Sequence, residues 1–126
     1  MTIKKLSKDD IIRLHSELIN TYGGTHGVRD DALFDSAMAA PFQSFGGVDF
    51  YPSIEEKAAR LGYGLAANHP FHDGNKRIGA HAMLIFLDIN GIALNCSSKE
   101  LSDIFLSIAS GNTEESELLD WINSHK

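Results

Sequence analysis

The sequence predicts an all-α fold, a single compact helical bundle over residues 1–126 with one small flap. Two observations predict it. Apolar residues recur at helical spacing along most of the chain, and the breaks between these runs carry glycine, proline or capping residues. Only residues 43–52 lack a helical pattern, and their glycines and aromatic residues favour a loop or a small β-hairpin.

Two helices are predicted before this flap. The first begins after Ser7, an N-cap with Asp10 three residues later, where negative charge suits a helix N-terminus. It stops at Gly23-Gly24. A second, short helix follows Asp30, and Pro41 ends it.

Four helices are predicted after the flap. Ser53 with Glu56 and Ser97 with Glu100 are capping boxes that each open a helix. Between them lies the most apolar helix, which closes at Gly91 and belongs in the centre of the bundle because it is apolar on nearly every side. An amphipathic helix ends the chain.

Composition excludes several classes of protein. The 126 residues include 11 Lys+Arg and 17 Asp+Glu, a net charge of −6, which argues against direct binding to nucleic acid or anionic lipid. No run approaches the ~20 apolar residues of a membrane span, and the charged start does not resemble a secretory signal. Cys96 is the single cysteine, so an internal disulfide is excluded. A cytoplasmic location is the expectation.

One segment, residues 68–80, concentrates the chemically active side chains. Pro70 and Gly74 both break helices, which predicts a loop over residues 69–74. Lys76 and Arg77 then fall in the first turn of the next helix, where free N–H groups and the positive end of the helix dipole meet. Cations there oppose the dipole unless an anion binds, so we interpret the segment as a phosphate site. A plain turn with solvated cations is the alternative.

Two residues of this segment fit catalytic roles. His69 is a candidate general base, because imidazole is the side chain that ordinarily titrates near neutral pH. Asp73, beside a phosphate, suits Mg²⁺, although it could instead cap the following helix. A Zn²⁺ or Fe²⁺ site of His69, His72, Asp73 and His81 ranks lower, because the set lacks a histidine pair at i and i+4.

The segment resembles the signature of the Fic/Doc family, H-x-F-x-[DE]-[GA]-N-x-R. The matching residues are His69, Phe71, Asp73, Gly74, Asn75 and Arg77. Residues 22–24, 26–30, 45–47 and 51–59 also resemble the short death-on-curing (Doc) branch, so the resemblance covers nearly the whole chain. We interpret Phe71, an aromatic residue between polar ones, as a core anchor for the loop.

The resemblance implies an all-α enzyme that most often transfers AMP from ATP to a hydroxyl of a target protein. It implies His69 as catalytic base, Asp73 as the Mg²⁺ ligand, and Gly74, Asn75 and Arg77 as phosphate-binding residues. It also implies a hairpin flap, here within residues 44–52, that aligns the target segment.

Two positions depart from the AMP-transferring pattern. Lys76 replaces a glycine, and Ala80 replaces a second arginine that would clamp a phosphate. This N-K-R form resembles the Doc branch, which implies a toxin kinase that uses ATP and Mg²⁺, with Lys76 among the nucleotide-binding residues. Its implied target is a threonine of elongation factor Tu, a translation factor, and the implied outcome is blocked translation. Adenylyl transfer and a catalytically silent binding module remain alternatives.

The resemblance also implies a separate antitoxin chain. Many Fic enzymes carry an inhibitory helix with [S/T]-x-x-x-E-[G/N]. Thr113 and Glu117 have that spacing, but Leu118 follows in place of glycine or asparagine. We therefore interpret Thr113 as the N-cap of the last helix and expect inhibition by another protein.

Overall fold

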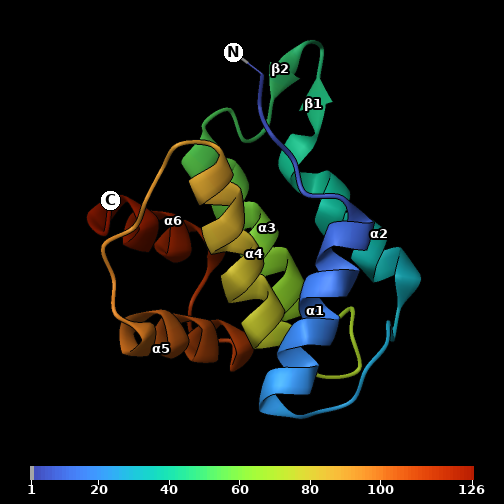
Figure 1. Cartoon of the computed structure of the whole chain (residues 1–126). Helices are drawn as coiled ribbons and strands as arrows, with labels where there is room; N and C mark the ends of the chain where they lie inside the picture. Colours follow the sequence, from blue (N-terminus) through green and yellow to red (C-terminus); the bar gives the residue numbers. More distant parts are fainter. Residues whose placement is uncertain (1) are drawn as a thin grey trace.

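The computed structural model describes residues 2–126, and it confirms the all-α prediction (Figure 1). The described residues form six α-helices, one 3₁₀ turn and one two-stranded antiparallel sheet. In chain order these are α1 (Lys8–Tyr22), α2 (Asp31–Ala39), η1 (Ala40–Phe42), β1 (Ser44–Phe45), β2 (Val48–Asp49), α3 (Ile54–Asn68), α4 (Asn75–Ile89), α5 (Ser98–Ala109) and α6 (Glu115–Ser124). None of the helices within this described part is long and apolar enough to span a bilayer.

The antiparallel pair α3 and α4 lies at the centre of the bundle, with α1 and α2 on one side and α5 and α6 on the other (Figure 1). The two central helices approach closely where both have glycine. A Cβ on Gly79 would lie only 2.8 Å from the carbonyl oxygen of Gly62. The most apolar helix is therefore central, as predicted, and the loop that joins the pair is residues 69–74.

Five of the six predicted helix starts are confirmed, including that of α4 at Asn75, and one is wrong. Capping boxes form at Ser7, Ser53 and Ser97, and the Asp30 side chain caps α2. Thr113 is not an N-cap, because its hydroxyl pairs with that of Ser107 at 2.5 Å. The box that opens α6 begins one residue later and uses backbone and side-chain groups of Glu114 and Glu117. The second helix gives way to the 3₁₀ turn around Pro41.

The flap is a hairpin, as predicted, with Gly46 and Gly47 at its turn, both at positive φ (59° and 80°). Lys57 of α3, only 2% exposed, holds it by contacts to the Asp49 carboxylate at 3.3 Å and to the Tyr51 carbonyl oxygen.

The hairpin lies within residues 44–52, as the family resemblance implies, but at the far end of α3 from the signature loop. It lies before the start of α3, whereas the loop 69–74 follows the end of that helix (Figure 1). Fifteen helical residues separate the two, a rise of roughly 22 Å. The hairpin thus precedes the signature loop in the chain, as predicted, and the length of α3 separates the two in space.

Candidate active site

His69 occupies an unusual backbone position. It is the C-cap of α3 with φ 50° and ψ 56°, and no other non-glycine residue among 2–126 has a positive φ. The left-handed conformation costs an L-residue about 1–2 kcal/mol, so helices usually end on glycine at such a position. The imidazole is exposed. Strain of this kind gathers at functional sites.

Arg29, from the segment between α1 and α2, holds this backbone in place. Its Nε donates to the His69 carbonyl at 2.8 Å and its Nη2 donates to that of Asn68 at 3.3 Å. The backbone N–H groups of Arg29 and Asp30 both donate to the Pro70 carbonyl, at 2.8 and 3.1 Å. A cation thus satisfies carbonyls that α3 leaves unpaired at its C-terminus. Sequence reasoning did not single out Arg29, although the family resemblance included residues 26–30.

The inside of the loop is pinned by Phe71 and Asn75. The Phe71 ring is 1% exposed, which confirms it as a core anchor, and its backbone forms a bridge with Val28. The Asn75 amide donates to the Phe71 carbonyl at 3.1 Å and accepts from the Phe71 N–H at 3.0 Å. Both polar atoms of this buried side chain therefore bond to the backbone of the loop. This leaves the backbone N–H of Asn75 as its group for binding an anion.

Asp73 is exposed, and two backbone N–H groups orient its carboxylate. Its Oδ1 accepts from the N–H of Gly74 at 2.8 Å and its Oδ2 accepts from that of Thr25 at 3.2 Å. Its carbonyl contacts His15 Nε2 at 2.8 Å. Asp73 does not cap α4, whose N-cap is Gly74. An oriented, exposed carboxylate beside a phosphate site fits Mg²⁺, which takes one or two carboxylates together with phosphate and water oxygens.

The first turn of α4 carries unpaired positive charge. No side chain caps this helix, unlike α1, α2, α3 and α5. Lys76 and Arg77 are exposed, and no carboxylate within the described residues forms an ion pair with either. The guanidinium carbon of Arg77 instead lies 4.4 Å from the centre of the Tyr22 ring. Free N–H groups and two cations make this turn suited to an anion.

The structure thus brings the predicted site residues His69, Asp73, Gly74, Asn75, Lys76 and Arg77 into one loop and one helix turn. It does not assemble the alternative transition-metal set of His69, His72, Asp73 and His81. Within residues 2–126, no three His, Cys, Asp or Glu side chains lie close enough to hold one metal ion.

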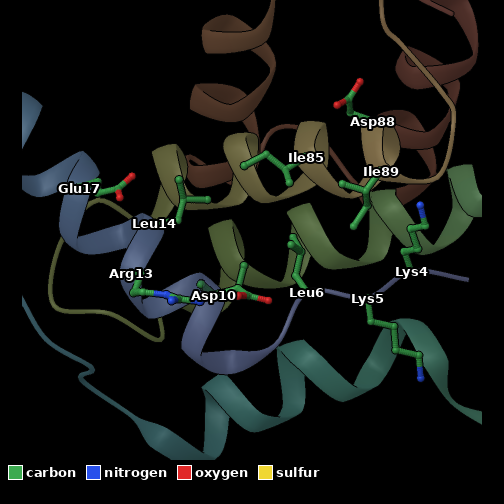
Figure 2. A pocket seen from close by; sticks show the side chains of 11 residues that line it. Lys4, Lys5, Leu6, Asp10, Arg13, Leu14, Glu17, Ile85, Asp88 and Ile89 are labelled. Carbon is green, nitrogen blue, oxygen red and sulfur yellow. Dashed lines mark hydrogen bonds and ion pairs between the residues drawn. The ribbon is translucent and has the colours of Figure 1, made fainter.

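A separate groove of about 840 Å³ lies between α1, α4 and the N-terminal segment (Figure 2). Leu6, Leu14, Ile85 and Ile89 supply apolar side chains, and charged side chains of both signs surround them. No signature residue lines this groove, so it is distinct from the loop 69–74.

The fold and the site therefore define a helical bundle whose two central helices are joined by a loop that leads into an uncapped, cationic helix start. A protein-family model described as "Fic/DOC family" matches residues 5–87 of the chain. The chain belongs to the Fic/DOC family. It is 43% identical to the "Toxin Doc" of Mycolicibacterium smegmatis over 89 residues, which cover 71% of this chain and 66% of that protein. It is 29% identical to the "Protein kinase doc" of Escherichia phage P1 over 118 residues, which cover 94% and 92% of the two chains.

Proposed function

We propose that the protein is a Doc-like toxin kinase, which transfers the γ-phosphate of ATP to a Ser/Thr hydroxyl of a translation factor and so blocks translation. Elongation factor Tu is the first candidate. The observation that carries the proposal is the arrangement of an exposed histidine, an oriented carboxylate and an uncapped, cationic helix start within residues 69–77. Similarity over 94% of the chain to a protein named a kinase supports it. Such a target places the reaction in the cytoplasm.

Each site residue has a role in this proposal. His69 takes the proton from the attacking hydroxyl, whose oxygen bonds to the γ-phosphorus as the bond from that phosphorus to the β–γ bridging oxygen breaks and ADP leaves. Lys76, Arg77 and the backbone N–H groups from Gly74 onward bind the phosphates. Asp73 holds Mg²⁺, which neutralises phosphate charge when bound.

The position of the label in ATP tests the proposal. The purified protein is incubated with Mg²⁺, a bacterial lysate and ATP labelled on either the γ- or the α-phosphate, with His69→Ala as the matched control. Label that enters a protein band from the γ position alone, and only with intact His69, supports a kinase. Label from the α position would assign adenylyl transfer instead. Label from neither, in a lysate that contains elongation factor Tu, would favour a silent binding module.

We further propose that a separate antitoxin chain binds this protein, and that the groove of Figure 2 receives an amphipathic segment of it. The groove offers apolar side chains between charges of both signs, as a short amphipathic helix requires. Leu14→Glu should then abolish capture of the protein by its antitoxin while ATP binding persists. Unchanged capture would place the antitoxin elsewhere.

A further inference from the structure

His15 is a buried histidine outside the family signature that contacts the signature loop at two points. It lies on α1 and is 2% exposed. Its ring stacks on that of Phe71, with centroids 3.9 Å apart and an interplanar angle of 13°. Its Nε2 lies 2.8 Å from the carbonyl oxygen of Asp73. A residue 58 positions away in sequence thereby holds both the anchor and the carboxylate residue of the loop.

The chemistry of this hydrogen bond defines the state of the ring. A carbonyl oxygen can only accept, so Nε2 carries the proton. Burial lowers the pKa of His15, which favours the neutral imidazole. The charged or titratable groups that act on it are His26 and Asp73. His15 is thus a neutral donor with its Nε2–H aimed at the loop.

The bond fixes a peptide plane that matters for the site. Since C=O and N–H point in opposite directions across a trans peptide, a carbonyl of Asp73 turned toward His15 turns the N–H of Gly74 away from it. That N–H is the group that holds Asp73 Oδ1 at 2.8 Å. The loop also lies close on this support, because a Cβ on Gly74 would be 3.6 Å from His15 Nε2 and 3.2 Å from Ile19 Cδ1.

We propose that His15 is a positioning residue for nucleotide binding: through the Asp73–Gly74 peptide it orients the Asp73 carboxylate toward Mg²⁺ and sets the start of α4. The inference rests on the proposed function, since it assigns His15 to the Mg²⁺·ATP site. A positioning role differs from simple core packing in its consequence: loss of the hydrogen bond should weaken binding of Mg²⁺·ATP specifically, whereas loss of packing should weaken binding of ATP with and without the metal.

Two variants separate the hydrogen bond from packing. His15→Phe keeps an aromatic ring against Phe71 but cannot donate, whereas His15→Gln keeps a donor that reaches as Nε2 does. Phe86→Leu is the matched control, because Phe86 is a buried aromatic residue of α4 whose ring contacts Phe42, far from the loop. Titration calorimetry measures the binding of ATP with MgCl₂ and with EDTA, and a thermal melt of each variant reports the fold.

We expect His15→Phe to weaken Mg²⁺·ATP binding about tenfold and to leave ATP binding in EDTA nearly unchanged, since the hydrogen bond to the Asp73 carbonyl, which fixes the peptide that orients the carboxylate, is lost. His15→Gln and Phe86→Leu should bind Mg²⁺·ATP nearly as the wild type does. Wild-type affinity in His15→Phe would overturn the inference. Equal losses with and without Mg²⁺, shared by Phe86→Leu at a similar melting temperature, would also overturn it.

An NMR measurement decides the inference even if the proposed function fails. The wild type should show a slowly exchanging His15 Nε2–H, and His15→Phe should shift the Gly74 amide signal while Phe86→Leu leaves it in place. If the wild type binds no Mg²⁺·ATP, the kinase proposal fails. A shifted Gly74 amide would still show that His15 positions the loop, and an unshifted one would refute that.

Discussion

The two ends of α3 are built on different rules. At its N-terminus, Ser53 and Glu56 form a capping box and the buried Lys57 is bonded to the hairpin. At its C-terminus, a histidine stands in a left-handed conformation where glycine is usual, and α4 then begins with no side-chain cap. Local preferences are satisfied at the first end and broken at the second. The broken end is the one that keeps polar groups available for a ligand.

Charged side chains show the same contrast. Lys57 meets a carboxylate and a carbonyl, so its charge is used within the fold. Lys76 and Arg77 meet no carboxylate in the part of the chain that the structure describes. Lys57 stabilises the hairpin, whereas Lys76 and Arg77 are available to bind a negatively charged ligand. The predictions below test this division between a structural end and a functional end.

The largest effect is expected from His69→Ala. Loss of the general base should lower phosphoryl transfer by roughly 10²- to 10⁴-fold, with ATP binding within a few-fold of the wild type. Single-turnover transfer of the γ-phosphate and titration calorimetry with ATP measure the two quantities. Full transfer activity in this variant would remove His69 from the chemistry and leave its left-handed backbone without a functional reason.

Arg77→Ala should weaken ATP binding by roughly 10- to 100-fold, because a charge-assisted hydrogen bond to phosphate is lost. Arg13→Ala is the matched control, since Arg13 is an exposed arginine whose partner is Asp10, within α1. Calorimetry with Mg²⁺·ATP measures both variants. Equal binding by Arg77→Ala and Arg13→Ala would show that Arg77 does not contact phosphate.

Lys57→Met should lower the free energy of unfolding by about 2 kcal/mol, because contacts of a charged donor are lost while the volume is kept. Lys99→Met removes an exposed i,i+4 pair with Asp103 and should change the free energy of unfolding far less than Lys57→Met does, because solvent screens an exposed pair. Urea denaturation gives both values. ATP binding should be unchanged in the two variants, and a loss in Lys57→Met would mean that the two ends of α3 are coupled.

A pair of glycine substitutions separates backbone strain from contact with the site. Gly24 has φ +120°, and a Cβ there would lie 2.7 Å from Asp73 Oδ2. Gly46 has φ +59° with nothing within 4 Å of a Cβ. Gly46→Ala should lose about 1 kcal/mol of stability from strain alone, and Gly24→Ala should lose more because its Cβ also meets Asp73, but only Gly24→Ala should raise the Mg²⁺ concentration needed for ATP binding. Similar Mg²⁺ requirements in both would show that Asp73 tolerates displacement.

Sequence reasoning succeeded where the deciding interactions are local. Capping boxes act over three residues and the hairpin turn over two, so Ser53, Ser97 and Gly46-Gly47 could be interpreted directly. The signature loop likewise lies within one short segment. Thr113 was misassigned because Glu114, next to it, offers a competing box and the Thr113 hydroxyl finds Ser107.

The residues that support the site from outside were missed for a different reason. Arg29 and His15 contact residues of the loop that lie 40 and 58 positions away in sequence. The spacing of apolar residues along the chain does not predict contacts between such distant polar residues. Their isolated polar character is equally typical of a surface arginine or a satisfied core histidine. The separation of the hairpin from the signature loop, in contrast, could be predicted, because the helix over residues 54–68 lies between them.

The smallest effect is a dependence of stability on pH. Burial lowers the pKa of His15 and of His81, so the folded state takes up fewer protons than the unfolded chain below the ordinary histidine pKa of about 6.5. Their contribution to stability is full above that pH and falls as pH drops toward the lowered values. His125 opposes this, because the Trp121 carbonyl and Glu100 raise its pKa. Urea melts from pH 5 to 8 should show lower stability at the acidic end, flatter in His15→Gln and steeper in His125→Gln. A wild-type curve that rises toward pH 5 would mean that the contribution of His125 outweighs those of His15 and His81.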